Sequence, residues 1–190
     1  MSELAVDWNK NEIGRGHDFA RFALLAGLLR EHLYRGSVLD VGCDTGRLKQ
    51  LIGELDYTGI DARPEAIEVG KALFPSSRFI CARAEEWNPD QMFDAIVFNE
   101  SLYYLNNFSA ALDKFYACLQ IGGLLAISIY KHPRWFSPNH QALKQSKRFI
   151  VGTSEKVHDI IVSSGGFSWN ILVARKNSPC VAEVKEGLSQ

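Results

Sequence analysis

Cysteines are few in this sequence, and they are not grouped. Four are spread over 190 residues, as Cys43, Cys81, Cys118 and Cys180, with no C-x-x-C pair and no histidines at zinc-finger spacing. This scatter favours neither a disulfide framework nor a structural metal site, and it indicates reduced thiols of the kind found in a cytosol. We therefore expect a cytoplasmic protein with no bound metal ion.

Long apolar runs and an excess of either charge are missing too. No apolar run reaches about 18 residues, and residues 1–8 lack the basic start and apolar core of a secretion signal. The 21 basic and 22 acidic residues give a net charge of −1, which provides no surface for a polyanion. We expect neither a membrane nor nucleic acid as a partner, and one domain that is a monomer or a homodimer.

The most informative stretch is an apolar run that meets two glycines. Residues 38–48 read VLDVGCDTGRL, and the apolar residues that follow have the spacing of one helix face. This pattern predicts a buried strand, a tight turn through Gly42 and Gly46, and a helix. In a parallel α/β sheet a ligand binds at such a corner, where glycines allow the backbone to approach it closely.

Two better-known turns of this kind do not fit. A dinucleotide-binding G-x-G-x-x-G that begins at Gly42 needs glycines where the chain has Asp44 and Arg47, and no Gly-Lys-Ser/Thr follows. A nicotinamide dehydrogenase is therefore disfavoured. Asp61 ends the next apolar run and is positioned to accept both hydroxyls of a ribose, although it could serve only to cap the helix that begins at Pro64.

Strands and helices alternate along the chain. Strands are expected at 37–42, 56–61, 78–82, 93–99 and 124–130, and helices at 18–33, 46–54, 64–74 and 107–119. This alternation predicts a parallel sheet with right-handed crossovers. Gly122 and Gly123 are expected to turn the chain into the fifth strand.

The last third of the chain is less regular. A weak helix is expected at 138–148. After it we favour an antiparallel hairpin of residues 157–162 and 169–175 around Gly165-Gly166, because β-branched residues and a Gly-Gly turn are typical of hairpins. The alternative is a helix over 154–164 that ends at the first of these glycines.

Five ordered motifs stand within residues 17–176, and their order and spacing are more specific than any one of them alone. They comprise residues 38–46, 57–61, 79–87, 93–105 and 122–125. Together they resemble class I methyltransferases that use S-adenosylmethionine. The resemblance implies an α/β fold, a three-layer doubly wound sheet that is mostly parallel, with seven strands and the last one antiparallel. It makes 18–176 the domain, 1–17 an N-terminal arm and possible lid, and 177–190 a flexible tail.

The resemblance also implies which residues hold S-adenosyl-L-methionine and the product S-adenosyl-L-homocysteine. Gly42, Cys43 and Gly46 would wrap the methionine part, and Asp40 would steer its ammonium group through water or the turn backbone. Asp61 would hold the ribose hydroxyls.

The rest of the cofactor would be held from the next two strands. Ala62 would lie against the adenine, Ala84 would offer it a backbone donor, and Asn99 would hold the amino acid end with its backbone carbonyl.

Two positions depart from the family pattern. Asp44 replaces a frequent glycine, which is tolerable if its backbone angles are ordinary. Arg83 stands where the family often has an acid that accepts the adenine amino group. Glu85 is a possible substitute for that acid, or else a solvated loop residue.

The acceptor is expected above the carboxyl ends of strands one, four and five. Our catalytic candidates there are Glu100 and Tyr104 after the fourth strand, His132 after the fifth, and His17 from the arm, which could close over the pocket. Each has a structural alternative: Tyr104 could pack in the core, His17 could cap a helix, and His132 could be a surface loop residue.

A sulfonium methyl group is already activated, so the protein mainly has to align the acceptor and exclude water. We expect methyl transfer to an N or O atom of a small-molecule acceptor, a metabolite or natural product. Residues 99–102 lack the Asn/Asp-Pro-Pro-aromatic motif of base-methylating enzymes, and residues 100–105 look similar to small-molecule enzymes, including nodulation-type sugar N-methyltransferases. The alternatives are a protein or peptide methyltransferase and a non-catalytic cofactor-binding partner subunit.

Overall fold

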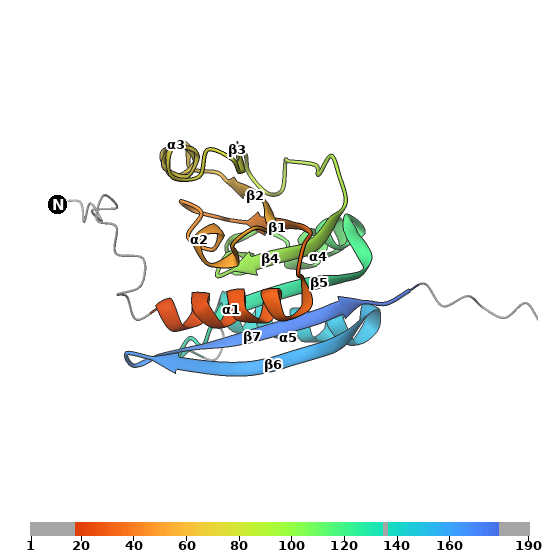
Figure 1. Ribbon diagram of the computed structural model, residues 1–190. Helices are drawn as coiled ribbons and strands as arrows, with labels where there is room; N and C mark the ends of the chain where they lie inside the picture. The colour runs from red at the N-terminus through yellow and green to blue at the C-terminus, as the bar shows by residue number, and fades with distance from the viewer. Residues whose placement is uncertain (1–17, 135–136, 179–190) are drawn as a thin grey trace, which may run out of the picture.

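One seven-stranded sheet organises the chain in the computed structural model, which describes residues 18–134 and 137–178. Its strand order is β3-β2-β1-β4-β5-β7-β6 (Figure 1). The strands are β1 (Ser37–Val41), β2 (Asp56–Asp61), β3 (Arg78–Cys81), β4 (Phe93–Asn99), β5 (Leu119–Tyr130), β6 (Ser154–Ser164) and β7 (Phe167–Lys176). The first five strands pair with one another in parallel, and β7 runs antiparallel to β5 and β6. The predicted sheet is confirmed.

Helices cover both faces of the sheet. They are α1 (Phe19–His32), α2 (Lys49–Ile52), α3 (Pro64–Leu73), α4 (Phe108–Ala117) and α5 (Pro138–Thr153), with a short 3₁₀ helix η1 (Leu102–Tyr104). Apolar residues of α1, α2 and α3 share one buried cluster, and those of α4 and α5 share another. Figure 1 shows α1 in front of the sheet, and α4 and α5 behind it. The predicted three layers are confirmed.

The central strand β4 shows why its sequence is almost entirely apolar. Ala95 and Val97 belong to the cluster on the α1 side, whereas Ile96 and Phe98 belong to the cluster on the α4 side. All four are fully buried. A strand covered on both faces has no solvent side, so both sets of alternating positions are apolar.

Strand β5 begins earlier than predicted. We expected Gly122-Gly123 to form a turn, but both glycines lie inside the strand. The pairing with β4 is irregular here, and Gly122 has a φ of +77°. A Cβ on Gly123 would lie 2.9 Å from the backbone oxygen of Asp94. The glycines therefore form a bulge in which two backbones approach closely, and the prediction of a turn was wrong.

The C-terminal part follows the favoured prediction. Helix α5 begins after Ser137, whose side chain accepts from the His140 N–H, and it extends to Thr153 rather than 148. Strands β6 and β7 form the predicted hairpin, so the alternative helix over 154–164 was wrong. Gly165 and Gly166 both have positive φ, as a two-residue hairpin turn requires.

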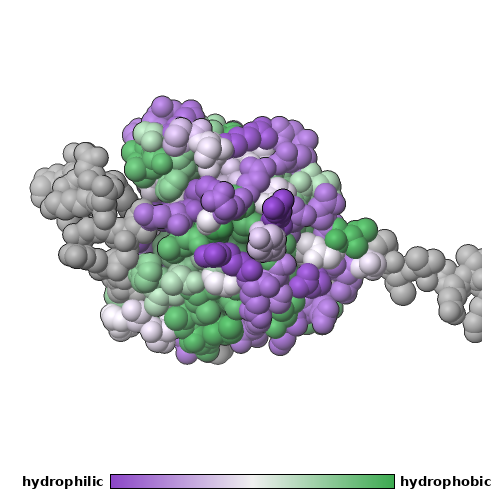
Figure 2. All heavy atoms as spheres, in the orientation of Figure 1, coloured by the Kyte–Doolittle hydropathy of each residue, from purple (hydrophilic) through white to green (hydrophobic). Residues whose placement is uncertain are grey.

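The surface drawn in Figure 2 mixes hydrophilic and hydrophobic residues. Within residues 18–134 and 137–178, no helix has the length and apolar character needed to span a membrane.

Candidate functional site

A cavity of about 690 Å³ opens at the carboxyl ends of β1, β2 and β4. Most of the predicted site residues line it: Asp40, Gly42, Cys43, Asp61, Ala62, Ala84, Glu85, Asn99, Glu100 and Tyr104. Gly46 and His132 are described by the structure but do not line it. His17 and the rest of the predicted lid lie outside the described residues. The cavity thus has the position that the sequence predicted for a ligand.

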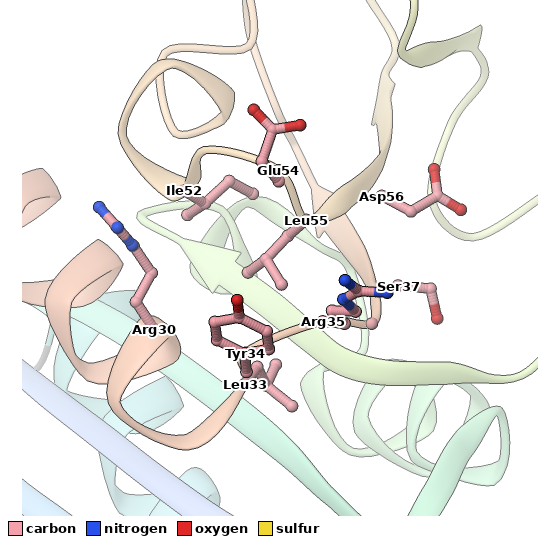
Figure 3. Close-up of a pocket in the computed structure, with 10 residues that line it drawn as sticks. Arg30, Leu33, Tyr34, Arg35, Ser37, Ile52, Glu54, Leu55 and Asp56 are labelled. Carbon is pink, nitrogen blue, oxygen red and sulfur yellow. The ribbon is translucent and has the colours of Figure 1, made fainter.

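A second cavity, of about 730 Å³, lies at the opposite edge of the sheet, where β1 and β2 begin. Its walls come from the end of α1 and the segment before β2 (Figure 3). The polar side chains of Arg30, Glu54 and Asp56 point in different directions. Because binding sites have convergent polar groups and lie at carboxyl ends of parallel strands, we assign the function to the first cavity.

The turn after β1 depends on its two glycines. Gly42 has a φ of +76° and Gly46 one of +79°. A Cβ on Gly42 would overlap Ser101, and one on Gly46 would lie 2.6 Å from the ring of Phe79. Gly46 therefore packs behind the turn, away from the cavity lining, where it shapes the turn that the cavity uses.

Asp44 corrects one expectation. Its φ is +52°, which is the left-handed region and not the ordinary one. Aspartate adopts this conformation more readily than most residues. The Asp44 N–H donates to Asp61 Oδ2 at 2.9 Å, and its Oδ1 lies 2.6 Å from Arg63 Nη2. The turn is thus tied to the end of β2, and Asp44 adopts there a left-handed conformation that a glycine would adopt without strain.

Asp61 lies just before α3 but does not cap it, because the cap residue is Arg63 and the helix has no side-chain cap hydrogen bond. Its Oδ1 accepts from the backbone N–H of Arg63, the residue that precedes α3, at 3.0 Å. Its Oδ1 also accepts from Arg63 Nε at 3.3 Å, and its Oδ2 accepts from the Asp44 N–H. Of about four acceptor positions on a carboxylate, one therefore stays free on Oδ2, and release of the exposed Arg63 side chain opens a second on Oδ1. The side chain is 12% exposed and lines the cavity, where that capacity can receive two hydroxyls.

Asp40 is a buried acid with one unpaired oxygen. Tyr57 donates to its Oδ2 at 2.8 Å, whereas Oδ1 has no partner among the described residues. Burial raises the pKa of Asp40 to about 7, although the Tyr57 hydrogen bond lowers it. An unpaired buried acceptor is costly. Because Asp40 lines the cavity, its charge favours a cationic ligand group, reached through water or the turn backbone.

The residue after β4 adopts a strained conformation. Glu100 has a φ of +61°, which a non-glycine residue rarely adopts and which often marks a functional position. Its Oε2 accepts from the Tyr103 hydroxyl at 2.9 Å. Burial raises the pKa of Glu100, whereas the nearby Arg21 guanidinium lowers it. The arrangement presents a mostly buried acid to the cavity.

Arg21 is a site residue that we did not predict. It comes from the first turns of α1, is 6% exposed, and lines the cavity. Its Nη1 donates to the side-chain oxygen of Asn99, which also accepts from Ser128 at 2.7 Å. Its Nε has no partner among the described residues. A lone charge inside the apolar stretch 19–29 was the available signal.

A second arginine accompanies it. Arg47 Nη1 donates to Asp18 Oδ2 at 2.7 Å, and Arg21 Nη2 lies 3.6 Å from the same oxygen. Both guanidinium groups stack over Phe22, at 4.4 Å for Arg21 and 4.7 Å for Arg47. Asp18 thus holds two cations at the wall that α1 contributes.

The side of the cavity assigned to adenine is held by backbone and rim contacts. Lys114 Nζ donates to the Ala84 carbonyl at 3.0 Å, and Glu85 Oε1 accepts from the Asn106 backbone at 3.3 Å. Arg83 Nε lies 3.3 Å from Glu86 Oε1. Glu85 lines the cavity at its exposed rim, so its contact with the adenine amino group stays a prediction.

The other catalytic candidates lie at the surface. Tyr104 is 77% exposed, and its ring contacts Tyr103 at 4.6 Å, so it is not a core residue. His132 Nδ1 accepts from the Arg134 N–H at 3.0 Å on the loop after β5. Its use as a base also stays a prediction.

Comparison with known proteins agrees with this geometry. The family model described as "Methyltransferase domain" matches residues 15–157. Malonyl-(acyl-carrier protein) O-methyltransferase of Acetivibrio thermocellus is 31% identical over 120 residues, which is 60% of this chain and 42% of that protein. Trans-aconitate 2-methyltransferase of Klebsiella pneumoniae is 30% identical over 146 residues, 74% of this chain and 56% of that protein. The chain spans about half the length of the curated relatives it matches.

Solved structures share the fold. The N-methyltransferase NodS from Bradyrhizobium japonicum WM9, in complex with S-adenosyl-L-homocysteine, has a TM-score of 0.73 at 19% identity, over 93% of this chain and 95% of that one. The 1,6-didemethyltoxoflavin-N1-methyltransferase of Burkholderia thailandensis has a TM-score of 0.68 at 20% identity, over 84% of this chain and 79% of that one.

Proposed function

The chain belongs to the methyltransferase domain family. We propose that it transfers the methyl group of S-adenosylmethionine to a small-molecule acceptor. One observation carries the assignment of the cofactor to the cavity. Asp40, a buried acid with one unpaired oxygen, and Asp61, which has acceptor capacity, both line this cavity. A ligand with an ammonium group at one end and a ribose further along satisfies both.

Different residues of the cavity bind different parts of the cofactor. Asp40 steers the ammonium group through water or the turn backbone, Asp61 receives the ribose hydroxyls, and Ala62 and Ala84 border the adenine. Arg21 adds what the sequence did not predict. Arg21 and Asn99 line the same cavity, and we place the cofactor's carboxylate beside this guanidinium, since a guanidinium recognises a carboxylate best.

The bound cofactor supplies an activated methyl group on a sulfonium, so the protein has to orient the acceptor, exclude water and manage one proton. Glu100 is the group for that proton. It is mostly buried, and its raised pKa brings it nearer to neutrality, where a general base works best. Tyr104, exposed at the mouth, is the candidate for contact with the outer part of the acceptor.

An oxygen acceptor is the first one to test. The relatives aligned at about 30% identity are an O-methyltransferase for malonyl-(acyl-carrier protein) and a methyltransferase for trans-aconitate. The N-methyltransferases are similar in fold at 19% and 20% identity. Small carboxylic acids and alcohols therefore precede amines in an acceptor screen.

The test begins with calorimetric titration of the full chain with S-adenosylmethionine, S-adenosylhomocysteine and NAD. We expect the first two to bind and NAD not to bind. Asp61→Ala removes charged hydrogen bonds to the ribose and should weaken S-adenosylhomocysteine binding by about 10- to 100-fold. Asp56→Ala, an exposed aspartate at the start of the same strand, should leave it unchanged.

The second step is transfer of a labelled methyl group to acids, alcohols, amines and short peptides. Cofactor binding with transfer to a small molecule supports the proposal. Transfer to peptides alone would favour a protein methyltransferase, and binding without any transfer would favour the non-catalytic partner subunit. Failure of both sulfur compounds to bind would overturn the assignment of the cavity.

A further inference from the structure

Two histidines meet far from each other in sequence. His32, in the last turn of α1, and His158, on β6, are 126 residues apart, yet their Nε2 atoms lie 3.1 Å from each other. Glu31 Oε2 lies 3.8 Å from His158 Nε2. One potential ligand atom of each residue lies within 4.8 Å of the others. The proposed active site lies at the other end of α1. Arg21, which lines its cavity, precedes His32 by eleven residues, or roughly 16 Å along the helix.

A bulge in β6 accounts for the position of His158. Lys156 pairs with Ala174 and His158 with Val173, so Val157 is an extra residue in the strand. Without it, neighbouring side chains would face opposite sides of the sheet. With it, Val157 packs against the cluster on the α1 side and His158 also contacts α1. Bulges commonly redirect a side chain in this way.

We propose that Glu31, His32 and His158 form a binding site for a divalent transition-metal ion, with Zn²⁺ as the best match. Two imidazoles on one tetrahedral zinc, with bonds of about 2.0–2.1 Å, have their nitrogens about 3.3 Å apart. Two histidines and a glutamate are an established zinc donor set that leaves a fourth position for water. Imidazole ligands favour zinc over magnesium or calcium.

The cluster is open to an incoming ion. The His158 side chain is 23% exposed and that of Glu31 is 59% exposed. The glutamate also supplies negative charge at the solvent side. A small movement of this exposed carboxylate brings it to a bonding position, whereas the two ring nitrogens already have nearly the required separation.

Arg175 sets the condition under which the site takes up metal. Its Nη2 lies 3.3 Å from His32 Nδ1, and since arginine only donates, that nitrogen is an acceptor and the proton is on Nε2. His32 then donates to His158. A metal bound to Nε2 requires the proton on Nδ1 instead, so the contact between Arg175 and His32 has to break, although the other guanidinium nitrogen is held by its 2.9 Å bond to the Gly122 carbonyl. Arg175 therefore opposes binding through both its donor and its charge.

The test is calorimetric titration of the full chain, without a polyhistidine tag, with Zn²⁺ and separately with Mg²⁺. We expect one Zn²⁺ per chain and no Mg²⁺. His32→Ala and His158→Ala should each weaken Zn²⁺ binding by about 10-fold or more, and Glu31→Gln by less. Arg175→Gln should tighten it by about three- to tenfold, because a repelling charge and a competing donor are lost. His140→Ala, at the start of α5, should have no effect.

A spectroscopic measurement avoids dependence on variants that fold poorly. Co²⁺ added to the unaltered chain should give the intense visible absorption of a tetrahedral site, and Zn²⁺ should abolish it. Zn²⁺ binding that is equal in the unaltered chain and in the His32→Ala/His158→Ala double variant would overturn the proposal. Absence of both Zn²⁺ binding and the Co²⁺ spectrum would do so as well.

Discussion

Asp40 is a buried carboxylate whose two oxygens have different surroundings, one bonded to Tyr57 and one unpaired. Its pKa of about 7 lies above the ordinary value of about 4. Between these two values the folded protein keeps a proton that the unfolded chain has released. Stability therefore falls as the pH rises from about 4 to about 7, by at most about 4 kcal/mol, and is level above that range.

Asp40→Asn isolates this contribution. Asparagine stays neutral and can still accept from Tyr57, so the variant should lose the part of the decrease that belongs to Asp40 and should be more stable than the unaltered protein at pH 8. Urea unfolding without cofactor at pH 5 and pH 8 measures the difference. Asp56→Asn is the control. Equal pH dependence in the Asp40 variant and the unaltered protein would contradict the raised pKa.

Glu100 provides a second prediction for a single residue. Glu100→Gln keeps the size of the side chain but cannot accept a proton, so turnover should fall by about 10²- to 10⁴-fold while S-adenosylhomocysteine affinity changes little. Initial rates and calorimetry on the same preparation separate the two effects. Glu86→Gln, at a side chain that is 73% exposed, should have neither effect. Full activity of the Glu100 variant would remove it from the acceptor site.

The element that the candidate site depends on most is the turn between β1 and α2. Gly42 and Gly53 both have positive φ, at +76° and +63°, but they differ in the space around them. A Cβ on Gly42 would overlap Ser101, whereas a Cβ on Gly53 would have nothing within 4 Å. The pair separates the cost of an unfavourable backbone conformation from the cost of a clash.

Gly53→Ala should destabilise the protein by about 1–3 kcal/mol from the backbone conformation alone, because φ of +63° with ψ of −126° is a combination that side chains rarely adopt. Gly42→Ala should cost about 1–3 kcal/mol more, because Ser101 has to move, and it should also weaken cofactor binding. Urea unfolding of both variants tests this comparison. Equal destabilisation would show that the turn adjusts to a side chain at position 42.

The sheet as a whole brings the turn after β1, the end of β2 and the end of β4 to one edge, and α1 adds a further wall to the cavity there. A ligand that contacts all of these segments should stabilise the entire fold. At about 100 times its Kd, S-adenosylhomocysteine should add about 2.7 kcal/mol, which corresponds to a rise in Tm of about 5–10 °C. NAD at the same concentration should give no rise. Calorimetric melting measures both, and an unchanged Tm with S-adenosylhomocysteine would contradict binding across the sheet edge.

The sequence by itself was enough to predict the succession of strands and helices along the chain and most of the residues that line the cavity. Local rules predict the alternating strands and helices, the two glycines of the turn, and the acids at or next to the ends of β1, β2 and β4. They do so because the periodicity of apolar residues and the place of a residue at a strand end depend on near neighbours in sequence. Asp40, Asp61 and Glu100 could therefore be placed together at one cavity before the fold was known, whereas their roles stay predictions.

The tertiary structure decided what depends on which elements become neighbours. Arg21 reaches Asn99 only because α1 packs across the sheet, and His32 meets His158 only because β6 joins the far edge and bulges there. The bulge at Gly122 and the left-handed backbone of Asp44 likewise depend on an adjacent strand. Contacts between residues so distant in sequence leave no local pattern, since they are set by packing and strand order rather than by spacing along the chain.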